Sequence, residues 1–334
     1  MKVLITGGLG YVGSICSEIL LECGHEVVIF DNVSTGFKES LPSKAMLVEG
    51  DLLKERDVRK AFEKISPDSV LHFAGLSQLS DSFANPGEYY RSIISGGVHL
   101  LESMKDFGCK SIVFPSSCAV YGLPEKMPID ERTPLKPISP YGHAKVMFEQ
   151  MLAWYGKIHE FKHVSLRFSN ASGATSKNGE RRMDQGRLIS RALLVALGKV
   201  EYVPVYGDNH PTPDGTCIRD YVHVSDVAEA CSRALESERS GAYNIGTGEG
   251  NSVLQVVDLV RKVTNEEVPI RMMPPRKGEA PRVVAACHRA KMDWQWKPKH
   301  QRLVDIIETA WEWVQAHPEV HQSDKHATAK KTAK

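Results

Sequence analysis

The sequence lacks any apolar run long enough to cross a membrane and has almost no net charge. No stretch approaches the roughly 20 apolar residues that a membrane-spanning helix needs. Its 42 Lys and Arg residues against 41 Asp and Glu residues leave a net charge of +1. Such a balance gives no overall attraction to nucleic acid or to a membrane surface. We therefore expect neither as a partner, and any anion-binding site must be local.

Cysteines are also few and form no recognisable pattern. The seven are an odd number, are scattered along the chain and contain no C-x-x-C pair. This distribution argues against a disulfide framework and against a zinc site. The start, MKVLITGG, is too short an apolar run for a secretory signal. We expect no metal site and a cytoplasmic location.

What the sequence does contain is an alternation of short β-branched runs with longer helical patterns, which is typical of a parallel sheet covered by helices. It predicts an α/β fold, a Rossmann-type doubly wound parallel sheet. The expected buried strands are residues 2–6, 26–30, 46–49, 69–73, 111–115 and 164–168, with helices near 11–23, 57–65, 87–107 and 140–160.

The pattern becomes irregular after residue 169, with helices expected near 187–198, 225–236, 252–263 and 302–316 and short strands between them. We expect residues 1–169, joined by a segment that returns near 219–236, to form the dinucleotide-binding domain. Residues 170–317 are expected to form a smaller, interleaved α/β substrate domain. The Lys-rich tail, 318–334, is expected to be disordered.

A glycine motif follows the first expected strand and opens the first helix. Gly7, Gly10 and Gly13 permit a tight turn, a close approach of the backbone to a pyrophosphate, and close packing of the helix on the strand. The N-terminus of the helix adds free N–H donors and a positive dipole end. The motif predicts a dinucleotide site at this first strand–helix junction.

Two carboxylates follow the next expected strands. Asp31 ends the second strand, where a carboxylate accepts hydrogen bonds from both adenosine ribose hydroxyls and repels a 2′-phosphate. This favours NAD over NADP as the cofactor, although Asp31 also suits a turn before Asn32. Asp51 could face the adenine or simply start a helix.

Tyr141 and Lys145 stand four residues apart at the start of an expected helix, which places both on one face. A free tyrosine has a pKa of about 10. A neighbouring ammonium and a positively charged nicotinamide ring favour the phenolate and make Tyr141 a candidate base. Ser117 follows the fifth expected strand and could hold a sugar hydroxyl in line with Tyr141.

Taken together, these residues resemble the extended short-chain dehydrogenase/reductases, and most closely the UDP-glucose (UDP-galactose) 4-epimerase family. The resemblance runs to about residue 317. Its motifs are MKVLITGGLGYVGS at the start, D-N-x-S-T-G at 31–36, HFAG at 72–75, SSCAVYG at 116–122, SPYGHAK at 139–145, N-x-x-G-A at 170–174 and YGDNHPTPDGTCIRDYVHVSD at 206–226.

The resemblance implies a UDP-sugar substrate that is epimerised at carbon 4 through a transient 4-keto sugar. It also implies Tyr141 as the base, Lys145 as a ribose-binding partner and Ser117 as a ligand of the substrate hydroxyl. The implied NAD-binding residues are Gly7, Gly10, Tyr11, Val12, Gly13, Asp31, Asn32, Ser34, Thr35, Gly36, Asp51, Leu52, Phe73, Ala74, Gly75, Tyr141 and Lys145; the implied substrate-binding residues are Ser117, Asn170, Arg187, Tyr206, Arg219, Arg276 and Glu279.

Within that implied site, Asn170, Arg219 and Arg276 are expected to hold the nucleotide diphosphate, because guanidinium groups match phosphate oxygens. Tyr206 is expected to stack near the uracil. The alternative for Arg219 is a salt bridge with its neighbour Asp220. The family also forms dimers through helices that correspond to 87–107 and 140–160, so a homodimer is expected.

Several positions depart from the family pattern: Ser77, Ile93, Ser169, Arg187, Glu279 and Val283. A small Val283 could admit an N-acetylated sugar; alternatively, the pocket suits a 6-carboxylate or a pentose, and Arg187 could contact an anion. Cys118 and Ala119 offer no acid–base group where related dehydratases carry an acidic residue, which disfavours dehydration.

Three hypotheses therefore stand. The first is 4-epimerisation of UDP-glucose and UDP-galactose; the second is epimerisation of UDP-N-acetylglucosamine, UDP-glucuronate or a UDP-pentose, or reduction of a 4-keto sugar. The third, from a different class, is a non-catalytic NAD-binding protein on the same scaffold. Two other features are expected to be structural: His223, and the loop 246–252, where Ser252 and Gln255 match a helix capping box.

Overall fold

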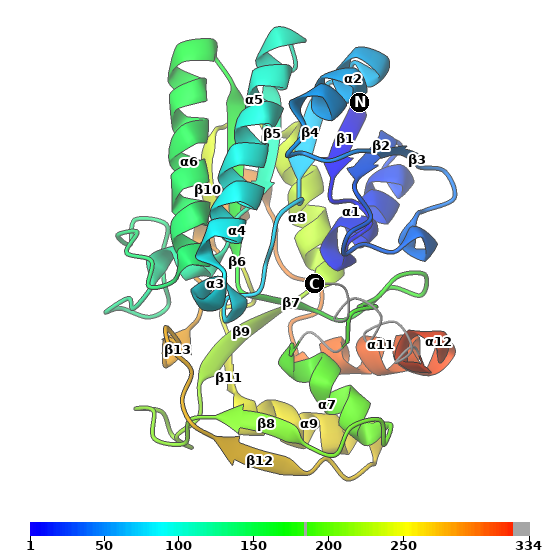
Figure 1. The fold of residues 1–334 in the computed structure, drawn as a ribbon. Coiled ribbons are helices and arrows are strands. Elements are labelled where there is room, and N and C mark those ends of the chain that lie inside the picture. Colours follow the sequence, from blue (N-terminus) through cyan, green and yellow to red (C-terminus); the bar gives the residue numbers. More distant parts are fainter. Residues whose placement is uncertain (184–185, 323–334) are drawn as a thin grey trace.

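The computed structural model describes residues 1–183 and 186–322, and its centre is a seven-stranded parallel sheet in the order β10-β6-β5-β4-β1-β2-β3 (Figure 1). The predicted Rossmann-type fold class is confirmed. The chain order reverses direction between β1 and β4, which is where such sheets bind ligands. The strands are β1 (Lys2–Thr6), β2 (Glu26–Asp31), β3 (Met46–Glu49), β4 (Ser69–His72), β5 (Ser111–Pro115), β6 (Lys162–Phe168) and β10 (Gly241–Ile245).

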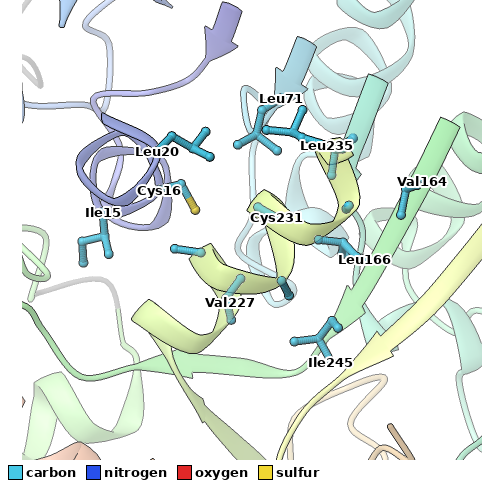
Figure 2. Packing of buried hydrophobic residues seen from close by; sticks show 14 of the residues in the cluster. Ile15, Cys16, Leu20, Leu71, Val164, Leu166, Val227, Cys231, Leu235 and Ile245 are labelled. Atoms are coloured by element: carbon cyan, nitrogen blue, oxygen red, sulfur yellow. The ribbon is translucent and has the colours of Figure 1, made fainter. Parts of the chain in front are cut away.

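Helices cover both faces of this sheet because successive strand residues point to opposite sides. On β1, Val3 and Ile5 pack with α1 (Tyr11–Glu22) and α8 (Val224–Glu236), whereas Leu4 packs with the helices of the other face. Figure 2 shows apolar side chains of α1 and α8 meeting over the strands. The helices of the other face are α2 (Glu55–Ile65), α5 (Gly96–Asp106) and α6 (Pro140–His159).

The helix expected at 87–107 is divided into three pieces. It consists of α4 (Pro86–Tyr90), a π-helical turn at Arg91–Ser95 and α5, with the short α3 (Asp81–Ala84) before it. The π turn carries Ile93, which is buried in the same core cluster as Tyr141 and would touch a Cβ at Gly75 at 3.3 Å. The departure at Ile93 therefore fills core space rather than the site.

Most of the second half of the chain, apart from α8, β10 and α10 (His288–Trp294), forms a separate layer beneath the carboxyl ends of the strands (Figure 1). Its core joins α7, α9 and α11 and includes Trp313. Its elements are β7 (Asn170–Ser172), α7 (Leu188–Ala196), β8 (Val203–Tyr206), β9 (Ile218–His223), β11 (Gly250–Ser252), α9 (Val253–Thr264), β12 (Ile270–Met273), β13 (Arg282–Val283), α11 (Leu303–Ala316) and α12 (Glu319–Gln322). The helix α10 packs instead against β10, in the core of the large sheet.

Two features of this half differ from the expected domain plan. β10 pairs in parallel with β6 and so belongs to the large sheet, because Tyr243 and Ile245 complete the core beside α8. The short helix α12 lies inside the tail that was expected to be disordered from residue 318, and residues 323–334 lie outside the described residues. No helix in the described part of the chain is both long and apolar enough to cross a membrane.

Candidate active site

A cleft of about 960 Å³ opens at the carboxyl ends of the parallel strands, between the large sheet and the second layer. It is lined from both halves of the chain, so it brings together residues that are far apart in sequence. All the sequence-predicted site residues line this cleft except Gly36. A Cβ on Gly36 would lie 2.6 Å from that of Leu9, so Gly36 supports the glycine loop from behind.

The glycine loop is built for close backbone contact. Gly7 has a φ of +71°, and a Cβ there would lie 2.6 Å from the backbone nitrogen of Ala74. A Cβ on Gly13 would lie 2.4 Å from the Gly7 carbonyl oxygen. The helix α1 begins after Gly10, which supplies no side-chain cap, so its first N–H groups face the cleft. This cradle fits the pyrophosphate of a dinucleotide.

The carboxylate of Asp31 lies next to this loop at the end of β2. It is nearly buried and accepts hydrogen bonds from the backbone N–H of Leu9, at 3.1 Å, and of Val33, at 2.8 Å. Asp31 thus both stabilises the turn that follows β2 and lines the cleft. Asp51 also lines the cleft and accepts a bond from the Leu53 N–H at 2.9 Å.

Tyr141, Lys145 and Ser117 all line the cleft, and the Nζ of Lys145 lies 5.8 Å from the centre of the Tyr141 ring. Ser139 caps α6 by accepting the Gly142 N–H, which fixes the first turn that carries Tyr141. Burial raises the pKa of Tyr141, and a hydrogen bond with Ser117 and the charge of Arg187 lower it. The expected lowering of the phenol pKa is therefore not produced by the protein's side chains alone.

Lys145 is buried beneath the tyrosine. Its Nζ donates to the Pro115 carbonyl at 2.8 Å and lies 4.3 Å from the centre of the Phe114 ring. Burial lowers the pKa of Lys145 to about 7, against a smaller opposing effect of the Glu149 carboxylate. His72, whose pKa burial lowers to about 3, is neutral beside it.

This lowered pKa predicts a pH-dependent difference in stability between the wild type and Lys145→Met. The folded protein resists protonating Lys145, whereas the unfolded chain binds that proton up to a pH of about 10.4. In the protein freed of NAD, the free energy of unfolding of the wild type should therefore gain on that of the variant by up to about 1.4 kcal/mol per pH unit from pH 7 to 10. Urea unfolding of both proteins at each pH measures this, and a difference that does not vary with pH would contradict it.

The predicted arginines, Arg219 and Arg276, line the cleft from the second half of the chain. Arg219 of β9 forms an ion pair with Glu279 at 3.4 Å, and the guanidinium of Arg276 lies 3.6 Å from the centre of the Tyr206 ring. Asn170 donates weakly to the Asp220 carbonyl, at 3.4 Å. The cationic and aromatic groups expected for a nucleotide diphosphate thus line the same cleft, although they come from β8, β9 and the loop between β12 and β13.

The alternative pairing of Arg219 with Asp220 does not form. Asp220 is buried and accepts hydrogen bonds from the N–H groups of Thr247, Gly248 and Ala285 at 2.9–3.2 Å. The loop 246–252 therefore directs the N–H groups of Thr247 and Gly248 at a protein carboxylate, and Ser252 forms the expected capping box with Gln255. This confirms a structural role for the loop.

Arg187 lies where the second half of the chain approaches the glycine loop. It pairs with Glu180, and its guanidinium lies 5.1 Å from the centre of the Tyr11 ring. Sequence reasoning missed Glu180 and its cleft-lining neighbours Arg181 and Arg182. The Gly- and Arg-rich composition of this stretch was the available signal, but no spacing rule points to an irregular loop.

Three more of the positions that depart from the family pattern lie at the cleft. Ser77, Ser169 and Val283 line the cleft, and Val283 is the register partner of Arg219 between β13 and β9.

His223 lies outside the cleft. Its ring stacks on that of His300, with ring centres 3.9 Å apart, and forms a hydrogen bond with Thr309 at 3.0 Å. Burial lowers the pKa of His223 to about 3, consistent with the structural role expected for it.

Comparison with known proteins agrees with this geometry. Residues 3–246 match the model of the NAD dependent epimerase/dehydratase family. The chain belongs to this family. The predicted family resemblance and the predicted cofactor, NAD, are thereby confirmed, and the glycine loop with Asp31 is the part of the structure that fits NAD.

Individual members of the epimerase/dehydratase family match along almost the whole chain. UDP-glucose 4-epimerase of Corynebacterium glutamicum is 38% identical over 336 residues, covering 100% of both chains. The structure of UDP-glucose 4-epimerase from Brucella ovis in complex with NAD has a TM-score of 0.89 at 37% identity, covering 93% of this chain and 97% of the other. That from Bifidobacterium longum, with NAD+ and UDP, has a TM-score of 0.91 at 32% identity, covering 96% and 100%.

Proposed function

We propose that the protein is an NAD-dependent 4-epimerase that interconverts UDP-glucose and UDP-galactose, and so acts in galactose metabolism. The observation that carries this proposal is that one cleft is lined by Ser117, Tyr141 and Lys145. The glycine loop, Arg219 and Arg276 line the same cleft. The likeness to UDP-glucose 4-epimerases over the full length supports it.

In the proposed reaction, Ser117 orients the 4-hydroxyl of the sugar and Tyr141 removes its proton. The chemistry that bound NAD would supply is acceptance of the hydride from carbon 4 of the sugar and its later return to the same carbon. Lys145 binds the cofactor ribose and stabilises the tyrosinate. After the 4-keto sugar has rotated in the site, Tyr141 returns the proton to the oxygen on carbon 4. The sugar therefore undergoes no net oxidation.

The remaining proposed contacts divide by ligand. Arg219, Arg276 and Asn170 hold the UDP diphosphate, Tyr206 lies near the base, and Arg187 and Glu279 complete the substrate site. A nucleotide held tightly while the sugar is held loosely allows the sugar to turn. In the structure, Arg219 is paired with Glu279, and a diphosphate would take over this ion pair with the guanidinium.

We also propose that the protein is a cytoplasmic homodimer. Val98 of α5 and Trp154 and Ile158 of α6 are exposed apolar side chains on the two helices through which the family's dimers form. All seven cysteines are free, in line with a reducing compartment.

A second candidate, epimerisation of a UDP-N-acetylhexosamine, is favoured by Val283, a small side chain in the cleft wall. One experiment tests both. Purified protein is incubated without added NAD with UDP-glucose, UDP-galactose, their N-acetyl forms or UDP-glucuronate, and the products are identified by NMR. We expect inversion at carbon 4 of the glucose–galactose pair. Inversion of another pair alone would mean that the substrate has been assigned wrongly. If no sugar nucleotide is converted, the result would favour a non-catalytic NAD-binding protein.

A further inference from the structure

A buried ion pair lies directly behind the proposed catalytic residues. Glu149 of α6 and Arg167 of β6 have side chains that are only 8% and 6% exposed. The guanidinium approaches both carboxylate oxygens, with Nε at 3.0 Å from Oε1 and Nη2 at 2.5 Å from Oε2. Neither residue lines the cleft, so the pair does not touch a ligand there.

This pair holds both ends of the short segment that carries Ser117. At one end, the Ser116 hydroxyl donates to Glu149 Oε1 at 2.5 Å. At the other end, Arg167 Nη1 donates to the Tyr121 hydroxyl at 2.9 Å, and that hydroxyl donates to Asn244 at 2.7 Å. A continuous polar network therefore fixes the segment between Ser116 and Tyr121 to α6 and β6.

Glu149 lies one helical turn beyond Lys145 on α6. The Lys145 ammonium donates to the carbonyl of Pro115, the residue that precedes Ser116. The Glu149 carboxylate opposes the lowering of the Lys145 pKa by burial. Glu149 thus acts on the lysine through charge and on the Ser117 segment through a hydrogen bond.

Stability alone does not account for this arrangement. Removing two charges from water is costly, and well-packed apolar residues in place of a buried ion pair often leave a protein equally stable or more so. A charged pair at this place is therefore better explained by what it aligns.

We propose that Glu149 and Arg167 are positioning residues for the proton-transfer step, holding Ser117 and Lys145 in register with Tyr141. This inference rests on the roles proposed above for those three residues. It assigns a role to two residues that do not line the cleft.

The test uses the neutral double variant Glu149→Gln/Arg167→Gln, which removes both charges and keeps hydrogen-bonding groups. Steady-state kinetics with UDP-galactose, thermal unfolding and a crystal structure are compared with the wild type. We expect kcat to fall at least fivefold while the KM for the sugar nucleotide and the retention of NAD stay within twofold. In the crystal structure, Ser117 Oγ or Lys145 Nζ should shift by more than about 0.5 Å.

Two further variants keep the test decisive. Tyr121→Phe removes one hydroxyl of the network without disturbing either charge; it should lower kcat at least twofold at unchanged KM, and it serves if the double variant does not fold. Asp226→Asn is the matched control: Asp226 is a buried carboxylate that accepts the N–H groups of Lys299 and His300 at 3.0 Å, away from the cleft. It should lose thermal stability but keep kcat.

The outcomes separate this inference from the proposed function. Unmoved Ser117 and Lys145 in the folded variants, or a kcat that stays near the wild-type value, overturns the inference, as does a parallel loss of NAD and rise in KM. A fully active Tyr141→Phe variant overturns the proposed function instead. The crystallographic comparison decides the positioning even if UDP-galactose is not turned over.

Discussion

Tyr141→Phe should lower kcat by about 10²–10⁴-fold while folding and NAD binding stay intact. General acid–base catalysis by a placed side chain is worth a factor of this size, and phenylalanine cannot accept or return a proton. The substitution keeps the ring, which contacts Tyr89 edge-on with ring centres 6.2 Å apart. The measurement is the initial rate of epimerisation at saturating substrate, with circular dichroism and NAD content as checks.

The matched control for this variant is Tyr90→Phe. The Tyr90 hydroxyl bonds the His143 ring nitrogen at 3.1 Å between α4 and α6, and the residue does not line the cleft. Loss of the Tyr90 hydroxyl should leave kcat within about twofold, because this group lies outside the cleft. The protein should also stay folded, because a single exposed hydrogen bond contributes only about 1 kcal/mol to stability. Near-normal turnover by Tyr141→Phe would mean that the base has been assigned to the wrong residue.

Gly13→Ala should have the second large effect, on stability and cofactor affinity together. The added Cβ would lie 2.4 Å from the Gly7 carbonyl oxygen and 3.0 Å from Gly8 Cα, both of them backbone atoms that cannot rotate away. The first helix must then move off the first strand. We expect the free energy of unfolding to fall by about 2–3 kcal/mol, the usual cost of overpacking a tight site.

Because the same movement displaces the N–H groups of α1 from a pyrophosphate, the dissociation constant for NAD should also rise at least about tenfold, or 1.4 kcal/mol. Urea unfolding and calorimetric titration of the apoprotein measure the two effects. Gly87→Ala is the control: its Cβ would meet only the end of the Arg91 side chain, at 3.6 Å. It should be neutral or stabilise α4 by about 0.5 kcal/mol. Wild-type stability and affinity in Gly13→Ala would refute the close-packing argument.

The part of the fold that sequence predicted best is the part with local signals. The six expected strands of the large sheet and the helices α1 and α6 fall within a residue or two of the observed bounds, because buried parallel strands read as short apolar runs between helical periods. β10 was not placed in the sheet, since a five-residue strand gives no sign of which sheet it joins. The π turn at Arg91–Ser95 likewise has no periodic signature.

The candidate site divides in the same way. Tyr141 and Lys145 share a helix face, and Gly7, Gly10 and Gly13 share one turn, so spacing alone could group them. That Arg219 pairs with Glu279, and that Glu180 meets Arg187 over Tyr11, depends on loops whose course the sequence does not encode locally. Asp220 shows the converse: it stands next to Arg219 in the chain but is turned away from it to bind Thr247 and Gly248.

By itself, then, the sequence determined the parallel α/β sheet, the dinucleotide loop, the preference for NAD and the Tyr–Lys pair, because each depends on periodicity or spacing within one strand–helix unit. Tertiary structure alone decided which distant charges meet: the pairing of Glu149 with Arg167 behind Ser117, the burial of Lys145, and the closing of the cleft by the second layer. The physical reason is that burial and ion pairing depend on how separate helices and strands pack together. Glu149 and Arg167 lie on α6 and β6, 18 residues apart in the chain, and only the packed core sets the distance between them.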